Sequence, residues 1–275
     1  MTGRLFVCAT PIGNLEDVTL RVLRVLAEVD LVAAEDTRRT RNLLSRHQIK
    51  ATLVSYHEAN ERAQAEFLIG RMMAGIRVAL VTDAGMPGIS DPGFQIVRRC
   101  IEEQIPVEVV PGASSILAAL IASGIGPARF CFDGFVPRKA GERIKRLKQL
   151  ASEERTVVFF ESPSRVKATL EAFLQVLGDR NMALARELTK VHEEVIRGKV
   201  SEVLQRLADP VLGEIVLVVE GAGPPTGGLD AAVAEAKSLV AGGMAPSRAA
   251  AEAAKAQGAL RRSVYEALLS KSGEE

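Results

Sequence analysis

The feature that most constrains the fold of this chain is the alternation of short apolar runs with amphipathic runs in its first half. Apolar, β-branched runs predict strands at residues 5–9, 31–34, 52–56, 76–82 and 107–110. Helical spacing between them is shown by Leu20, Leu23, Leu26 and Ala27, and by Phe67, Leu68, Met72 and Met73. Such alternation is typical of a largely parallel sheet covered by helices.

The rhythm changes near Pro111, where a helix at residues 114–123 is expected to lead into a second unit. That unit has predicted strands at 130–135, 156–160, 182–185 and 214–219, and helices around 142–150 and 165–177. We therefore expect an α/β fold with two α/β domains, residues 1–115 and 116–222, that meet at a cleft.

The chain beyond residue 220 has a different composition. The segment GAGPPTGG at 221–228 predicts a linker. An Ala-rich module at 229–275 follows, with short helices expected at about 231–240, 247–257 and 263–269. Pro246 and Gly258 supply start and stop signals for the middle helix. We expect a small module that resembles a helix-turn-helix.

Several classes of protein are disfavoured by composition. The longest apolar run, at 116–122, is far shorter than the roughly 18 residues that span a bilayer, so we expect no membrane partner and a cytoplasmic location. Cys8, Cys100 and Cys131 are odd in number and far apart, which favours reduced core thiols. The histidines show no zinc-like spacing, and we expect no metal. The net charge of +1 does not by itself indicate nucleic-acid binding.

Turns rich in Gly and Pro follow the expected strands at 9–14, 81–93 and 109–115. In open α/β sheets, ligands bind outside the carboxyl ends of the strands, where such turns allow close approach of the backbone. Any one of these segments alone can be a simple tight turn. Together they predict a site for a nucleotide-like cofactor, although neither the G-x-G-x-x-G fingerprint nor the phosphate loop is present.

Longer motifs support a more specific interpretation. The segments ATPIGNLEDVTLRVLRVLAEVDLVAAEDTRRT, VTDAGMPGISDPG, VVPGASS, FVPRK, FFESPSR and RELTKVHEE occur in this order within residues 4–221. This series resembles the ribosomal RNA small subunit methyltransferase I family of the tetrapyrrole methylase superfamily, and the C-terminal helices resemble that family's tail. The resemblance implies S-adenosylmethionine as cofactor, a homodimer, and methylation of a cytidine ribose 2′-oxygen in the decoding region of 16S rRNA, either free or within the assembled small subunit.

The resemblance also implies which residues line the cofactor cleft. Those of the first domain are Pro11, Gly13, Asp83, Ala84, Gly85, Pro87, Ile89, Pro111, Gly112, Ala113 and Ser114. Those of the second domain are Glu161, Ser162, Arg186, Glu187, Glu220 and Gly221.

Transfer to a ribose hydroxyl depends first on positioning, and a base can assist it. The candidate catalytic residues are Glu35, Asp36, Lys190 and His192. Glu35 and Asp36 also fit a helix N-terminus, where acids favour the dipole, and His192 fits a solvent-facing or structural histidine.

Two basic clusters are candidate RNA contacts. They contain Arg38, Arg39 and Arg41 in the first, and Arg138, Lys139, Arg143 and Lys145 in the second. The second is equally typical of a solvated helix face, but its Pro- and Gly-containing lead-in, FVPRKAG, favours phosphate contacts. Aromatic residues form only 4% of the chain, so we expect charge and RNA shape to recruit the substrate.

Two alternatives remain open. A methylase of the same fold that acts on a tetrapyrrole would have no RNA partner, although ATPIGNLED and the appended helices favour RNA. In the second alternative, the C-terminal helices read DNA and the α/β part is a ligand sensor. Arg248, Lys255, Arg261 and Arg262 are the basic residues of residues 248–262, in an Ala-rich context better suited to packing.

Overall fold

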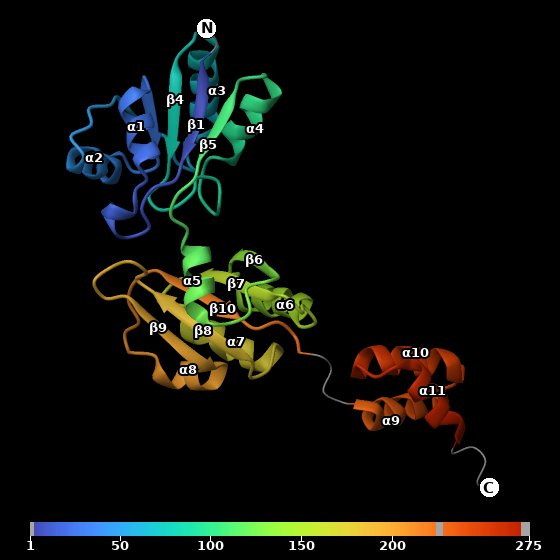
Figure 1. The fold of residues 1–275 in the computed structure, drawn as a ribbon. Coiled ribbons are helices and arrows are strands. Elements are labelled where there is room, and N and C mark those ends of the chain that lie inside the picture. Colours follow the sequence, from blue (N-terminus) through green and yellow to red (C-terminus); the bar gives the residue numbers. More distant parts are fainter. Residues whose placement is uncertain (1–2, 224–227, 271–275) are drawn as a thin grey trace. The chain divides into compact units, whose positions relative to one another are not determined.

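The computed structural model describes residues 3–223 and 228–270. The chain divides into two compact units, one made of Met1–Lys148 and Thr156–Glu220 and the other of Gln149–Arg155 and Gly221–Glu275. Figure 1 shows the elements of each unit. The first unit holds both β-sheets, so the α/β fold expected from the sequence is confirmed.

The first sheet has the strand order β3-β2-β4-β1-β5. Its strands are β1 (Arg4–Cys8), β2 (Leu31–Ala34), β3 (Leu53–Ser55), β4 (Arg77–Val81) and β5 (Val107–Val110). Every pairing in it is parallel; Val7, for example, lies opposite Leu80 of β4 and Val109 of β5. Burial of Val78–Val81 agrees with a strand covered on both faces.

Helices cover both faces of this sheet (Figure 1). They are α1 (Leu20–Glu28), α2 (Thr37–Arg46), α3 (Glu61–Met73) and α4 (Phe94–Glu102), with the short 3-10 helix η1 (Leu15–Asp17) before α1. The core on one face includes α1 and α2, and the core on the other includes α3 and α4. The helical spacing predicted the positions of α1 and α3 correctly. It did not predict their buried faces, because Leu20 is 86% exposed and Met73 is 61% exposed.

A topological switch point lies between the neighbouring strands β1 and β4. The chain leaves β1 toward α1 on one face and leaves β4 toward α4 on the other. Backbone hydrogen bonds tie the loops beyond these strands together: Thr10 N donates to Gly85 O at 2.9 Å, and Gly85 N donates to Thr10 O at 3.1 Å. This is the location where open α/β sheets bind ligands.

Helix α5 (Ser115–Ser123) connects the two sheets. The Ser114 hydroxyl accepts a hydrogen bond from Leu117 N at its start, and Gly124 ends it in the left-handed conformation. The second sheet has the order β6-β7-β10-β8-β9. Its strands are β6 (Phe130–Phe135), β7 (Thr156–Glu161), β8 (Asn181–Arg186), β9 (Glu194–Lys199) and β10 (Ile215–Val219).

The second sheet is mixed. Strands β6 and β7 are parallel, whereas β10 is antiparallel to both β7 and β8, and β9 is antiparallel to β8. Strand β9 was missed from the sequence, because EVIRGK lies at the sheet edge and buries only Ile196. Helices α6 (Ala140–Leu150), α7 (Val166–Val176) and α8 (Val200–Arg206) complete the elements of this part. Helix α5 packs on β8 and β10 through Ala119 and Leu120.

The C-terminal unit contains the helices expected from the sequence: α9 (Gly228–Ala241), α10 (Pro246–Gln257) and α11 (Arg261–Ser270). Pro246 begins α10, and Gly258 ends it with φ 66°. The core of this unit is built mainly from alanines of α9 and α10. Of the expected linker at 221–228, residues 224–227 lie outside the described residues. No helix in the described ranges is long and apolar enough to cross a membrane.

Two of the three cysteines are core residues, as the sequence indicated. Cys8 and Cys100 are buried, and Cys131 is half-buried in β6. Burial raises the pKa of both the Cys8 and the Cys100 thiols to about 12, so these two groups stay neutral thiols at physiological pH.

Candidate active site

Three of the pockets formed by the described residues meet at Ala84, in the loop after β4. We call them the polar, central and apolar pockets, with volumes of about 240, 310 and 310 Å³. The polar and central pockets also share Ile12 and Glu214, and the central and apolar pockets share Asp91 and Phe160. The shared residues place the three pockets side by side at the carboxyl ends of the first sheet, and we call them together the cleft.

The loop after β4 is held in conformations that favour glycine. Gly85, Gly88 and Gly93 have φ values of 79°, 83° and 137°, and the non-glycine Ser90 has φ 65°. Non-glycine residues in this region occur where the surrounding structure imposes the conformation, and they cluster at functional sites. The path of this loop places Ala84, Ile89 and Asp91 along the cleft.

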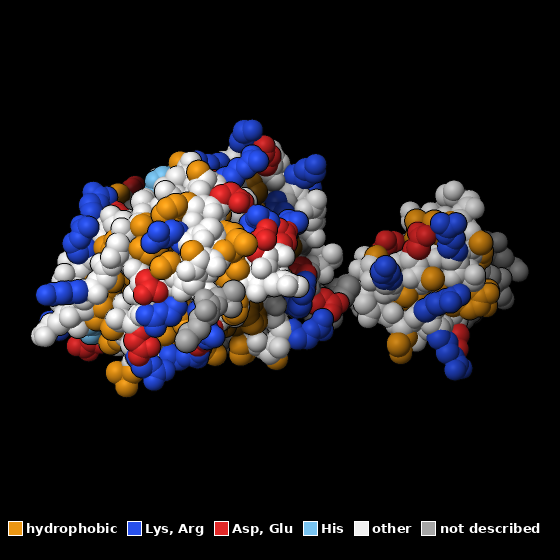
Figure 2. Space-filling view, turned by 90° about the horizontal axis from the view of Figure 1, so that it is seen from above, with side chains coloured by type: hydrophobic (Ala, Val, Ile, Leu, Met, Phe, Trp, Pro, Cys, Tyr) orange, Lys and Arg blue, Asp and Glu red, His pale blue; other side chains and the backbone are white. Residues whose placement is uncertain are grey.

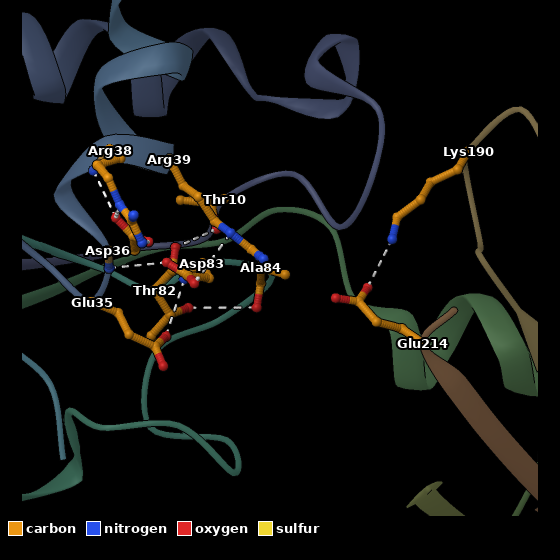
Figure 3. Close-up of polar contacts among 10 residues, drawn as sticks. All are labelled: Thr10, Glu35, Asp36, Arg38, Arg39, Thr82, Asp83, Ala84, Lys190 and Glu214. Atoms are coloured by element: carbon orange, nitrogen blue, oxygen red, sulfur yellow. Dashed lines mark hydrogen bonds and ion pairs between the residues drawn. The ribbon is translucent and has the colours of Figure 1, made fainter. Parts of the chain in front are cut away.

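The polar pocket has a chain of hydrogen bonds on one wall, drawn in Figure 3. Asp83 N donates to Glu35 Oε2 at 3.2 Å, and Asp36 N donates to Asp83 Oδ1 at 3.0 Å. Asp36 caps α2 by accepting from Arg38 N at 2.8 Å, and Arg39 Nε lies 3.5 Å from Asp83 Oδ2. Arg39 and Asp83 line the pocket, whereas Glu35 and Asp36 lie behind this wall.

Two of these carboxyl groups have shifted pKa values. Hydrogen bonds from Arg38 hold the pKa of Asp36 well below its usual range. Burial raises the pKa of Glu35, with a smaller opposing effect of the hydrogen bond from Asp83.

Lys190 lies on the opposite wall (Figure 3). Its Nζ is 2.9 Å from Glu187 Oε1 and 3.2 Å from Glu214 Oε2. Partial burial opposes the charge, but the hydrogen bonds to Glu187 and Glu214 raise the pKa of Lys190 above its ordinary value. Lys190 is therefore a cation at neutral pH.

The loop that carries Lys190 fits tightly against the loop after β1. Glu187 and Thr189 adopt positive φ values of 51° and 65°, and Asn14 N donates to Thr189 Oγ1 at 3.0 Å. A Cβ atom added at Gly13 would lie 2.7 Å from Leu188 O. Gly13 is thus required by close approach, and both α/β parts of the first unit contribute to the polar pocket.

The central pocket combines apolar side chains with a buried carboxylate. Phe135, Phe160 and Ile215 line it together with Glu161, whose side chain is only 1% exposed. Glu161 accepts from Thr169 Oγ1 at 2.6 Å and from Ser162 N at 2.7 Å, and it pairs with Arg165 at 2.5 Å. Its charge is therefore fully partnered inside the protein.

The structure brings most of the sequence-predicted cofactor residues to the cleft. The residues that line one of the pockets are Pro11, Gly13, Asp83, Ala84, Gly85, Ile89, Ser114, Glu161 and Ser162. Other predicted residues lie nearby without lining a pocket: the carbonyl oxygen of Ala113 approaches Gly85, and Glu187 reaches Lys190. Pro87, Pro111 and Gly112 belong to the same loops but line none of these pockets.

Some predicted residues are not at the cleft. Glu220 follows the end of β10. Because β10 is antiparallel to β7, the carboxyl end of β10 lies beside the start of β7 rather than beside Glu161. Glu220 accepts a hydrogen bond from Asn181 there, and Gly221 belongs to the C-terminal unit. Arg186 pairs with Glu194, and His192 is exposed in a turn that lines none of the pockets.

Gly213 and Glu214, which precede β10, line the central pocket, whereas Glu220 and Gly221 line none of the three pockets. Sequence reasoning also missed Asn42, Asp91, Phe135 and Phe160. Asp91 lies inside the quoted segment VTDAGMPGISDPG, so its position in a Gly-rich loop was the available signal. For Glu214 the missing information was the direction of β10.

The basic clusters differ in their setting. Arg39 lines the polar pocket, and Arg38 and Arg41 are exposed beside it on α2. Arg138, Lys139 and Lys145 are exposed in or just before α6, whereas Arg143 is half-buried and donates to Arg138 O at 3.5 Å. In Figure 2, the Lys and Arg side chains are spread over the visible face of the larger unit rather than gathered in one patch. Across residues 3–223 and 228–270, no cluster of three or more His, Cys, Asp or Glu side chains could hold a metal ion.

Comparison with known proteins gives consistent results. The family model for Tetrapyrrole (Corrin/Porphyrin) Methylases matches residues 4–204. The ribosomal RNA small subunit methyltransferase I of Thermotoga maritima is 47% identical over 80% of this chain and 99% of its own length. The enzyme of the same name from Pasteurella multocida is 41% identical over 97% of this chain and 96% of its own length. The solved structure of uroporphyrin-III C-methyltransferase from Thermus thermophilus, complexed with S-adenosyl homocysteine, has a TM-score of 0.57 at 22% identity, covering 78% of this chain and 97% of that chain.

Proposed function

We propose, from the premise that this chain belongs to the ribosomal RNA small subunit methyltransferase I family of the tetrapyrrole methylases, that it methylates the 2′-oxygen of a cytidine ribose in the decoding region of 16S rRNA with S-adenosylmethionine as the donor. The observation that carries the proposal is the cleft itself. A polar pocket flanked by arginines and two pockets lined by aromatic side chains meet at Ala84, so a methyl donor and an RNA acceptor can be held against one point.

The residues of the central and apolar pockets fit S-adenosylmethionine. Phe135, Phe160 and Ile215 offer an apolar surface for the adenine ring, and Glu214 and Asp91 offer carboxylates for the positive groups of the methionine part. Bound there, the cofactor supplies an electrophilic methyl group on a sulfonium. The loop from Gly85 to Ile89 then excludes water from one side of the reacting groups.

The polar pocket fits a nucleotide of the RNA. Arg39 and Lys190 place cations on opposite walls for the flanking phosphates, and Asn42 adds an amide able to contact a base edge. Lys190 already holds two carboxylates and has a raised pKa, so we assign it to orienting the RNA rather than to accepting a proton. Glu35 and Asp36 serve to fix Asp83 and the start of α2.

Positioning supplies the main catalytic effect in this scheme. Holding donor and acceptor in line removes most of the entropy of a two-molecule encounter. Exposed Arg38, Arg41, Arg138, Lys139 and Lys145 extend the positive surface for phosphate contacts outside the pocket, and half-buried Arg143 supports the loop at Arg138. An rRNA substrate implies a cytoplasmic location, and we expect a homodimer, as the family resemblance implies.

The test is transfer of a labelled methyl group from S-adenosylmethionine to free 16S rRNA, to assembled small subunits and to a uroporphyrinogen-type tetrapyrrole. Ribose-methylation mapping then locates the product. We expect label at one cytidine 2′-oxygen in the decoding region. Methylation of the tetrapyrrole with no transfer to either RNA substrate would replace the RNA proposal with the tetrapyrrole alternative.

A further inference from the structure

Asp91 lines both the central and the apolar pocket. It follows Ser90, whose positive φ turns the loop, and Ala84 lines the same two pockets. Among residues 3–223 and 228–270, no hydrogen bond or ion pair joins the Asp91 carboxyl group to another residue, and only burial and neighbouring charges act on it. This carboxyl group therefore faces the cleft without a protein partner, unlike Glu161 in the same pocket.

The charges near Asp91 are mainly negative. Burial, together with the charges of Glu35, Asp83 and Glu214, raises the pKa of Asp91 to about 7. No Lys or Arg is among the described residues that line the central and apolar pockets. The two cations that line the adjoining polar pocket are engaged by carboxylates, because Arg39 lies 3.5 Å from Asp83 and Lys190 lies 3.2 Å from Glu214. Asp91 is thus close to half protonated at neutral pH while no positive ligand is present.

We propose that a cationic centre of the ligand entering this cleft displaces the proton of Asp91, and that the cleft therefore binds the sulfonium of S-adenosylmethionine in preference to the neutral thioether of the demethylated product. The inference rests on the proposed function, because it assigns the cofactor to the central and apolar pockets. The junction at Ala84 is where donor and acceptor pockets meet, so the charged sulfur belongs near the carboxylates that surround it.

This arrangement has a consequence for turnover. Transfer of the methyl group from the sulfonium to the ribose oxygen, with release of the hydroxyl proton to solvent, would leave a neutral thioether and would remove the positive charge that kept Asp91 ionised. Asp91 then regains affinity for a proton, and the attraction that held the cofactor disappears with the charge. The product is released more readily than the cofactor.

The test is calorimetric titration of the protein with S-adenosylmethionine and with S-adenosylhomocysteine in buffers of different ionisation enthalpy. At pH 7 we expect the sulfonium ligand to release about 0.5 proton and the thioether to release almost none. Between pH 6 and pH 8 the affinity for S-adenosylmethionine should rise by about tenfold, because the ionised fraction of Asp91 rises by that factor.

The variant Asp91→Asn should bind both ligands with little proton release and should lose the tenfold rise. Asp230→Asn, which removes an exposed carboxylate of α9, is the matched control and should behave as the parent. A melting scan of each variant reports whether it is folded. Equal proton release by the parent and Asp91→Asn, or equal affinity of the parent for both ligands, would overturn the inference while leaving the methyltransferase proposal intact. Failure of the folded parent to bind either ligand would overturn both.

Discussion

Replacing Glu161 by Gln should destabilise the first unit strongly, because this carboxylate is buried and fully partnered. The change removes the negative charge opposite Arg165 and converts one acceptor atom into a donor that faces Ser162 N–H or Thr169 Oγ1. Removing one member of a buried ion pair costs about 3–5 kcal/mol. Arg165 keeps a hydrogen bond to Ser162 Oγ and is 21% exposed, which places the expected loss near the lower limit, about 3 kcal/mol.

Differential scanning calorimetry measures this loss. For a unit of this size, a loss of about 3 kcal/mol lowers the melting temperature by roughly 6–12 °C. The control is Glu142→Gln, because Glu142 pairs with Lys139 at 3.2 Å while both side chains are more than half exposed. An exposed pair contributes well under about 1 kcal/mol, so the control should melt within about 2 °C of the parent. Equal shifts for the two variants would show that burial of Glu161 is not the source of its stabilising effect.

Three further outcomes are expected. Gly85→Val should lower both the stability, by about 1–2 kcal/mol, and the cofactor affinity, because Gly85 has φ 79° and lines the apolar pocket. Melting and binding measurements on the same samples separate the two effects, and a lower melting temperature with unchanged affinity would assign Gly85 to the fold only. The second basic cluster is tested by replacing four residues together with Ala: Arg138, Lys139, Arg143 and Lys145. The variant should bind RNA more weakly, with a slope of log affinity against log salt reduced by roughly 0.7 to 0.9 per phosphate contact, and its cofactor affinity should be unchanged. An unchanged slope would indicate that α2 recruits the RNA. Asp91→Asn should raise the melting temperature more at pH 8 than at pH 4. Burial raises the pKa of Asp91 to about 7 in the folded protein, so ionisation of this group lowers the free energy of unfolding of the parent as the pH rises toward 7. A difference in melting temperature that does not depend on pH would contradict the raised pKa.

Local sequence was sufficient for most of the elements. The strands β1, β2, β4, β5, β7 and β10 were predicted within a residue or two, because each is a short run dominated by apolar residues and bounded by turn residues. Among the C-terminal helices, α10 was predicted within one residue, since Pro246 and Gly258 act on the backbone at its two ends. The Gly-rich loops were correctly placed after the strands, because glycine at positive φ is a local requirement that the residue type reveals.

What only the tertiary structure decided is which of those loops meet and which side chains face the cleft. The direction of β10 brought Glu214 to the pocket and took Glu220 away from it, and direction is set by pairing with β7 and β8 rather than by the residues of β10. The charge state of Asp91 depends first on its burial, and then on the charges of Asp83 in the same loop and of Glu35 and Glu214 from other parts of the chain. Helical spacing likewise left the buried face of α1 undecided, because Leu20 and Val22 are both apolar and only packing against the sheet buries Val22. Local propensities act through neighbours along the chain, whereas register, direction and electrostatic environment depend on residues brought together by folding.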